Sequence, residues 1–163
     1  MKHGSRHMKQ KIKLESVMVG VTGEYYVAGE LSHRGYISSI TLRNTRGIDI
    51  IVSNKEGTKS ATIQVKSTQN NKKNSWILTQ KSEDFFSDNH FYVFVNLDQP
   101  GIRPKFFIVP SKEAAEFISS SHKNWLNKAG RNGQKHIDNP MRLFEDLESK
   151  YLESWDFIEN YLK

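Results

Sequence analysis

Runs of apolar residues that alternate with polar ones predict a β-hairpin in the first half of the chain. Its two strands are expected at 47–52 and 61–67, because both segments are rich in β-branched residues. The segment between them contains the Asn and Gly that turns favour. If the hairpin closes symmetrically, Asp49 lies opposite Gln64, and Lys66 shares their face of the sheet.

The first of these strands is apolar on both faces. Ile48, Ile50 and Ile51 surround Asp49, so we expect a strand that is covered on both sides. A carboxylate in such a strand is unfavourable unless a cation pairs with it, and a metal ion or a lysine would do so. The alternative is that Asp49 lies on the solvated face of an ordinary hairpin.

A helix is predicted before the hairpin, at 17–34, with Gly35 just past its end. Its apolar residues have helical spacing. The positions on this stripe are Val21, Glu24, Val27, Ala28 and Leu31. Glu24 therefore interrupts an apolar face, which makes it the second candidate acid. The alternative is a Glu at the edge of the core, or one that binds an arginine.

The remaining pattern predicts further strands and helices in one mixed α/β domain. We expect strands at 36–42, 76–78, 91–97 and 105–109, and helices at 80–86, 111–121 and 140–162. The last helix is predicted from apolar residues at helical spacing after Asn139-Pro140, a favourable helix start. Polar runs at 67–75 and 127–139 are expected to be loops, and the second of them is basic.

Length and composition favour a single domain with a mild basic bias. The chain has 163 residues and a formal charge of +6. Residues 1–7 look like an expression remnant before a native start at Met8, and without Lys2 and Arg6 the charge is +4, so the domain is expected at 8–163. There is no cysteine, which excludes thiolate metal sites and cysteine nucleophiles. No signal-peptide pattern or membrane-spanning run is present, so we expect a cytoplasmic protein without membrane contacts.

The candidate acids and the amide are all hard oxygen donors. If Glu24, Asp49 and Gln64 converge, helped by the backbone carbonyl of Val65, they form a set that suits Mg²⁺, with Mn²⁺ as the alternative ion. Such an ion polarises a phosphodiester and activates a water. Lys66 would then orient that water or stabilise the charge that develops on the phosphoryl oxygens.

Four cations near the hairpin are candidates for binding nucleic-acid phosphates. They are Arg43 and Arg46 at the turn before the first strand, and Lys72 and Lys73 in the polar run after the second. The alternative for the two lysines is a solvated loop.

These motifs resemble the PD-(D/E)xK nuclease superfamily, most closely the branch of archaeal Holliday-junction resolvases. The similar segments are Gly23-Glu24 with Gly35 eleven residues after the Glu, Gly47-Ile-Asp49-Ile, and Ile63-Gln64-Val65-Lys66-Ser67. The resemblance covers about 17–68. It implies a restriction endonuclease-like fold, which is a mixed β-sheet flanked by helices.

The resemblance also implies a role for each matching residue. Asp49 matches the metal-binding Asp, Lys66 the catalytic Lys, and Glu24 the helix Glu of the resolvase branch. Gln64 stands where the family usually has an acidic ligand, so the site has one negative charge fewer and ion binding should be weaker. The family's proline is replaced by Ile48.

The predicted function is therefore a Mg²⁺-dependent endonuclease that hydrolyses DNA phosphodiester bonds. The alternative is a nuclease-fold module with a weak or inactive site that binds nucleic acid or a protein partner. Related nucleases often act as dimers, because two strands need two active sites, so the resemblance also implies a homodimer, although no residue pattern identifies its interface.

Overall fold

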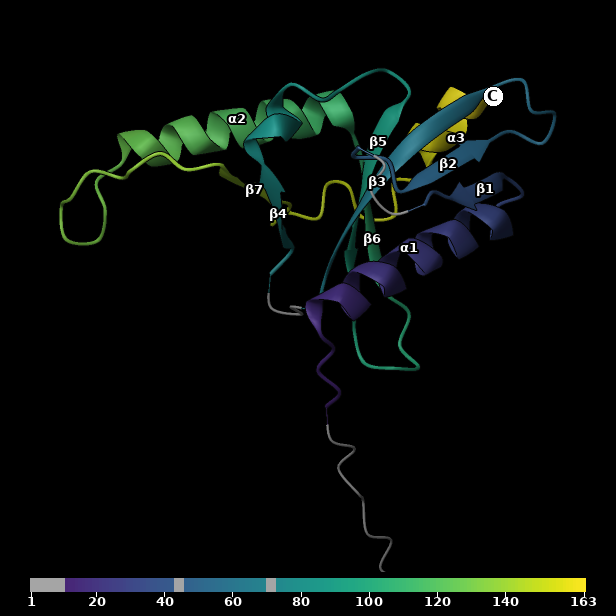
Figure 1. Cartoon of the computed structure of the whole chain (residues 1–163), viewed down its shortest axis with the longest axis horizontal. Helices are drawn as coiled ribbons and strands as arrows, with labels where there is room; N and C mark the ends of the chain where they lie inside the picture. Colours follow the sequence, from purple (N-terminus) through teal and green to yellow (C-terminus); the bar gives the residue numbers. More distant parts are fainter. Residues whose placement is uncertain (1–10, 43–45, 70–72) are drawn as a thin grey trace, which may run out of the picture.

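The computed structural model describes residues 11–42, 46–69 and 73–163. In chain order the elements are α1 (Ser16–His33), β1 (Ile37–Ile40), β2 (Ile50–Ser53), β3 (Ser60–Thr68), β4 (Ser75–Thr79), the 3₁₀ helix η1 (Gln80–Glu83), β5 (His90–Asn96), β6 (Lys105–Pro110), α2 (Ser111–Asn127), β7 (Met141–Glu145) and α3 (Asp156–Leu162). Figure 1 shows their arrangement. No helix in the described ranges is long and apolar enough to cross a membrane.

The strands form a mixed five-stranded sheet and a separate small sheet. The order in the larger sheet is β1-β2-β3-β5-β6, in which β3 and β5 are parallel and the other neighbours are antiparallel. β4 pairs with β7 in the two-stranded sheet. The prediction of a mixed sheet flanked by helices is confirmed.

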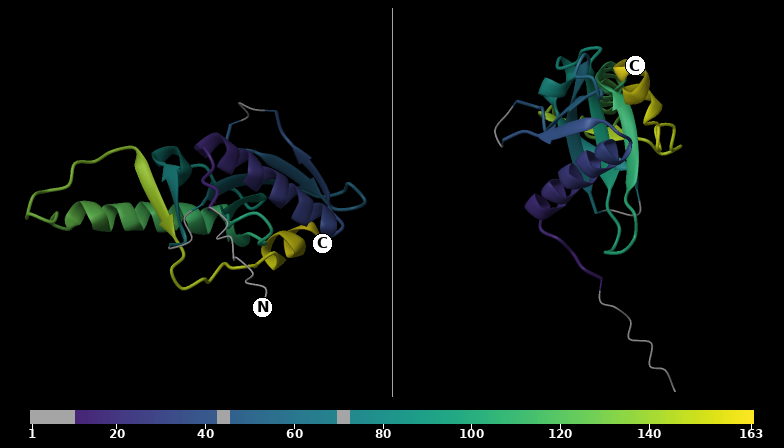
Figure 2. Two further views of the ribbon diagram at one scale, coloured as in Figure 1. Left: turned by 90° about the horizontal axis from the view of Figure 1, so that it is seen from below. Right: turned by 90° about the vertical axis from the view of Figure 1, so that its right-hand side faces the viewer.

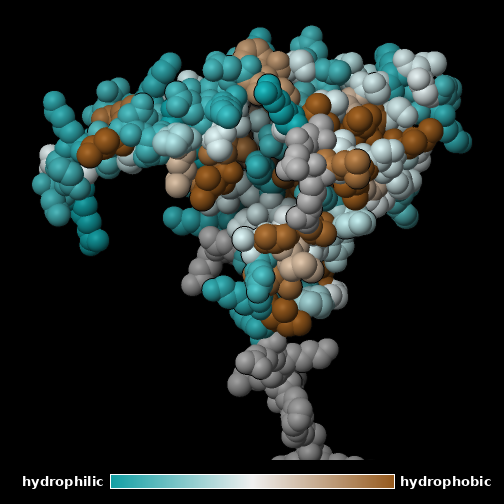
Figure 3. Space-filling view, viewed as in Figure 1, coloured by the Kyte–Doolittle hydropathy of each residue, from teal (hydrophilic) through white to brown (hydrophobic). Residues whose placement is uncertain are grey.

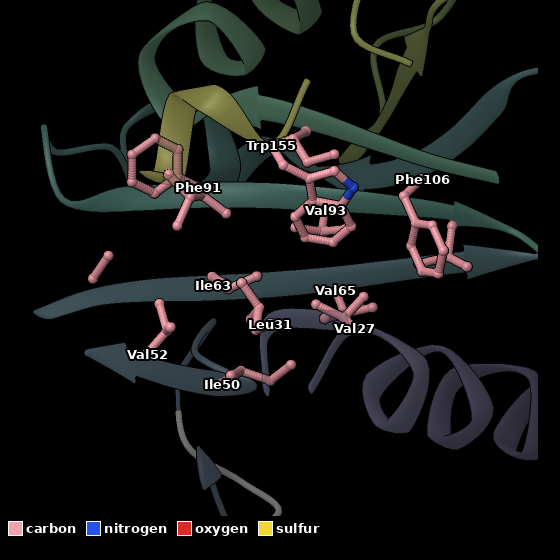
Figure 4. Close-up of a cluster of buried hydrophobic side chains, with 14 of the residues drawn as sticks. Val27, Leu31, Ile50, Val52, Ile63, Val65, Phe91, Val93, Phe106 and Trp155 are labelled. Carbon is pink, nitrogen blue, oxygen red and sulfur yellow. The ribbon is translucent and has the colours of Figure 1, made fainter. Parts of the chain in front are cut away.

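The two faces of the larger sheet carry two different cores. On β5, Phe91, Val93 and Val95 face α1 and α3, and Figure 4 shows part of this core. Tyr92 and Phe94 face the opposite way and pack with α2 and the small sheet. Figure 2 shows helices on both sides of the sheet. β5 and β6 are thus buried on both faces, as their continuous apolar runs predict.

The hairpin strands are covered on one face only, which corrects the expectation for the first strand. Ile50 and Val52 of β2 are buried, but Ile51 is 46% exposed. The second core contains residues of β5 and β6 but none of β2 or β3. The polar face of β3, which carries Gln64 and Lys66, therefore remains accessible.

The predicted helix over 140–162 is wrong. The segment instead forms β7, a turn region and the short helix α3. The Asp146 carboxylate accepts hydrogen bonds from the N–H groups of Lys150 and Tyr151, and Ser149 and Glu153 have positive φ angles of 58° and 56°. These conformations interrupt a helix. The periodicity misled because Tyr151, Trp155, Ile158 and Leu162 are all buried, although only the last two lie in a helix.

Other boundaries differ less. α2 continues to Asn127, six residues beyond the predicted end, and the helix expected over 80–86 is the short η1. The predicted strand at 76–78 is confirmed as β4, and its Trp76 is a core residue that is 3% exposed.

Helix α1 crosses β3 closely because Gly23 has no side chain. A Cβ at Gly23 would lie 1.7 Å from Ser67 Oγ and 2.9 Å from Ser67 Cβ. The absence of that atom lets the helix approach the end of β3 that carries Val65 and Lys66. Gly23 thus fixes where the following residue, Glu24, lies relative to the hairpin.

This contact predicts opposite effects for two glycines of one helix. Gly23→Ala should destabilise the fold by about 1–3 kcal/mol, because the new methyl group has to displace Ser67. Gly29→Ala is the control: no described atom lies within 4 Å of a Cβ there, so the better helix propensity of Ala should stabilise the fold by about 0.5–1 kcal/mol. Urea denaturation measures both, and equal stabilities of the two variants would contradict the close contact.

Candidate active site

Asp49 is held at the start of β2 by its own backbone. Its carbonyl accepts a hydrogen bond from the Thr41 N–H at 2.9 Å, and the Thr41 hydroxyl donates to the Ile48 carbonyl at 2.7 Å. Two residues earlier, Gly47 has a φ of +60°, and a Cβ there would lie 3.1 Å from the Phe85 ring. The sequence Gly-Ile-Asp therefore turns the chain sharply and places Asp49 directly before β2.

The side chain of Asp49 takes over a position in the β-ladder. From Ile50 onward the β2–β3 register is the one predicted. Asp49, however, is not paired with Gln64: its N–H donates to the Ile63 carbonyl at 2.8 Å, and its Oδ2 accepts from the Val65 N–H at 2.7 Å. This one-residue offset resembles a β-bulge, a distortion that often re-aims side chains near active sites. It directs the carboxylate toward the backbone of β3 at Val65.

Burial dominates the electrostatics of Asp49. It raises the pKa of the carboxyl group, although the hydrogen bond from Val65 and the positive charge of Lys66 both act to lower it. The catalytic role assigned to Lys66 stays a prediction. Asp49 also influences Tyr92: burial raises the pKa of the phenol, and the nearby negative charge raises it further.

Gln64 lines a cavity of about 570 Å³ on the accessible face of β3. Its other lining residues are Arg46, Gly47, Thr79, Lys81, Ser82 and Phe85. The cavity therefore joins the segment before β2 to the β4–η1 region. Two of its lining side chains are cationic, which makes it suitable for an anionic ligand.

Glu24 follows Gly23 on the part of α1 that crosses β3. Its side chain is partly buried, not at the centre of the apolar face, which is formed by Val19, Gly23, Val27 and Leu31. The convergence of the carboxylates of Glu24 and Asp49 stays a prediction.

The donor set contains few acids. Among the residues that the structure describes, no three or more His, Cys, Asp or Glu side chains form a group that could hold a metal ion. The predicted set has only two carboxylates, so it depends on the Gln64 amide and the Val65 carbonyl for further oxygens. Because the N–H and C=O of a strand residue point to the same side, the Val65 carbonyl is directed toward the side where Asp49 lies.

The four predicted phosphate-binding cations have different outcomes. Arg46 lines the cavity, and Lys73 is exposed just before β4. Arg43 and Lys72 lie outside the described residues. Their roles, like that of Lys73, stay predictions.

Sequence reasoning missed Lys81 and the aromatic residues around the cavity. Lys81 lies in η1, which follows β4, and no local pattern reveals where β4 lies relative to the larger sheet. His90 lies in edge contact with Phe85 and Tyr92, and its Nδ1 is 2.8 Å from the Thr62 hydroxyl. Burial lowers the pKa of His90 to about 4, so it is neutral at physiological pH and supplies no charge to the cavity.

Because the pKa of Asp49 is raised, ionisation of its carboxyl group should destabilise the fold. A carboxyl group whose pKa is higher in the folded chain than the ordinary 3.8 favours folding most below that value, and this contribution is lost as the pH rises through the folded pKa. Asp49→Asn should therefore melt a few degrees higher than the native chain at neutral pH, and the difference should vanish toward about pH 3.

Thermal melting followed by circular dichroism over this pH range measures the effect. The exposed Asp88→Asn serves as the control and should show no such trend. A native chain that is more stable than Asp49→Asn at neutral pH, without added metal, would contradict the account of a buried carboxylate.

Comparisons with known proteins find solved structures that are similar to this chain. No protein-family model matches the chain, and no curated protein matches it. The bacterial homing endonuclease I-Ssp6803I is 14% identical, with a TM-score of 0.47, over 90% of this chain and 93% of its own. Hjc, a Holliday junction resolvase from Archaeoglobus fulgidus, is 13% identical, with a TM-score of 0.46, over 81% of this chain and 86% of its own. At these identities and TM-scores, the two similarities say nothing about the activity of this chain.

Proposed function

We propose that the chain is a Mg²⁺-dependent DNA endonuclease whose active site is built around Asp49. The observation that carries this proposal is the half-buried Asp49 carboxylate, which accepts a hydrogen bond from the Val65 N–H of β3 and whose ionisation burial disfavours. A carboxylate whose ionisation the fold disfavours is expected where a cation is to be bound.

The oxygen donors around Asp49 fit a hard divalent ion. Asp49 Oδ2 already accepts a hydrogen bond, so we assign its Oδ1 to the metal, together with the Val65 carbonyl, the Gln64 amide and the Glu24 carboxylate. A bound Mg²⁺ would polarise the scissile phosphodiester and lower the pKa of a water molecule. Water would complete the octahedral set, as is usual for this ion.

The remaining groups would position the substrate. Arg46 and Lys81 at the cavity offer cations for the phosphates that flank the scissile bond. Lys66 Nζ would donate to the phosphoryl oxygens as their negative charge grows, or hold the attacking water in line. His90 is buried and does not line the cavity, which leaves the lysines and the arginine as the phosphate-binding groups.

The first test is cleavage of a panel of linear, supercoiled and branched DNA, with RNA as comparison, in Mg²⁺ or Mn²⁺. Asp49→Asn and Lys66→Met should each lower the rate by about a hundredfold or more, because each removes charge at the reacting phosphate. Lys59→Met, which removes an exposed cation from the β2–β3 turn, is the matched control and should cut at the native rate. Undiminished cutting by the Asp49 and Lys66 variants would refute the assignment.

Gln64 provides a second, more specific prediction. Gln64→Glu adds the negative charge that the donor set lacks, so the variant should reach half-maximal cleavage at a Mg²⁺ concentration about tenfold lower than the native chain. Gln64→Leu keeps a similar size without an oxygen and should shift the requirement upward. An unchanged Mg²⁺ dependence in both variants would show that this side chain is not a ligand.

A second candidate function is a nuclease-fold module that binds nucleic acid without cutting it. The neutral Gln64 and the presence of only two carboxylates in the donor set favour it. In that case the native chain would bind DNA with a strong salt dependence but would not cut with either ion. Recovery of cutting in Gln64→Glu would then identify the missing charge as the reason.

A further inference from the structure

A long part of the chain extends away from both cores. We call residues 119–140, which comprise the second half of α2 and the loop that leads to β7, the α2 arm. None of its residues is buried, whereas four residues in the first half of the helix are. Figures 1 and 2 show the end of α2 and this loop projecting beyond the sheets. The arm therefore adds little to the stability of the fold.

Apart from Asp138, the charged side chains of the α2 arm are all cationic. Between Glu116 and Asp138 the chain has no acidic residue but four cations. These are Lys123, Lys128, Arg131 and Lys135, all of them exposed. None of the four forms an ion pair with a carboxylate among the described residues. Asp138, at the base of the arm, instead contacts His122 at 2.7 Å and Arg142 at 3.9 Å.

The cations lie on an ordered scaffold. The His136 ring stacks on Trp125 with centroids 4.1 Å apart, which fastens the returning loop to the helix. At the tip, Ala129 and Lys135 form a β-bridge, and the Gly130 N–H donates to the Gln134 carbonyl at 2.7 Å. Arg131 and Lys135 are thereby presented on a closed loop, so little ordering is required when they bind a ligand.

A shallow cavity of about 430 Å³ runs along the same arm. It is lined by Phe117, Ser120, Ser121, Asn124, Trp125 and Lys128. Hydroxyl, amide and ammonium groups on one helix face are the donors that usually contact phosphate and sugar oxygens. In Figure 3 this end of the molecule is largely hydrophilic, with only small apolar patches. A charged surface of this kind does not suit an apolar protein partner.

We propose that the α2 arm binds the sugar-phosphate backbone of a nucleic-acid duplex, outside the cavity that contains Gln64. The inference rests on the proposed function only in taking nucleic acid as the partner, and it does not require cleavage. The helical part of the arm, 119–127, extends about 13 Å, which corresponds to roughly eight phosphate charges along a duplex. The arm would thus lengthen the bound segment and add affinity that is independent of sequence.

Binding measured without divalent ions tests this proposal. The combined variant Lys128→Ala, Arg131→Ala, Lys135→Ala removes three cations from the arm. The matched control removes three from the β2–β3 turn and the C-terminus, as Lys55→Ala, Lys59→Ala, Lys163→Ala. Affinities for duplexes of about 30 and about 8 base pairs are measured in EDTA by fluorescence anisotropy over a range of salt concentrations.

For the long duplex, the slope of log K against log salt is negative. In the arm variant its magnitude should be smaller by about 2.7, or about 0.9 for each lost phosphate contact. The control should change the slope by less than about 1. Equal slopes for the arm and control variants, or no duplex binding by the native chain, would overturn the proposal. A change in sedimentation without a change in DNA binding would also overturn it, in favour of a second copy as the partner.

The outcome is separable from that of the proposed function. A native chain that never cuts DNA, but whose binding depends on the arm, would refute the endonuclease and leave this inference intact. A native chain that cuts, but whose binding does not depend on the arm, would refute this inference alone.

Discussion

The hydrogen bond from the Val65 N–H to the Asp49 carboxylate is the interaction on which the site depends. At the point where β2 begins, the carboxylate accepts the N–H that a backbone carbonyl would accept in a regular ladder. The backbone of β3 therefore fixes the position of the Asp49 side chain. The same contact keeps the carboxylate partly out of water, which disfavours its ionisation. A fold that accepts such a charge is less stable than it could be, a pattern that is common where function requires strain.

The uneven covering of the sheet explains why this site is accessible. β5 and β6 lie between two cores, whereas β2 and β3 have helices on one face only. Gln64 and Lys66 alternate with the buried Ile63 and Val65, so a single strand supports the core and supplies the polar face of the site. On the opposite face of this strand, α1 approaches closely at Gly23, the residue before Glu24.

Much of this arrangement could be predicted from the sequence, because it depends on local patterns of residues. The β-branched hairpin, its register from Ile50 onward and the helix before Gly35 follow from periodicity and turn residues. The offset at Asp49 could not be predicted in this way. It involves a side-chain hydrogen bond, which leaves no trace in the alternation of apolar and polar residues. The helix expected after Pro140 was wrong because Tyr151 and Trp155 are buried but lie in a turn region, where Asp146 accepts the Tyr151 N–H. Their spacing in the sequence resembles that of a helix. Lys81 was missed because its position depends on how a second sheet packs.

The proposed active site requires a divalent ion beside Asp49. Anomalous diffraction from crystals grown with Mn²⁺ would locate such an ion without reference to activity. We expect a peak about 2.0–2.3 Å from an Asp49 carboxylate oxygen, with the Val65 carbonyl and the Glu24 carboxylate also in contact with the ion or its waters. A well-occupied peak elsewhere, with none at Asp49, would contradict it.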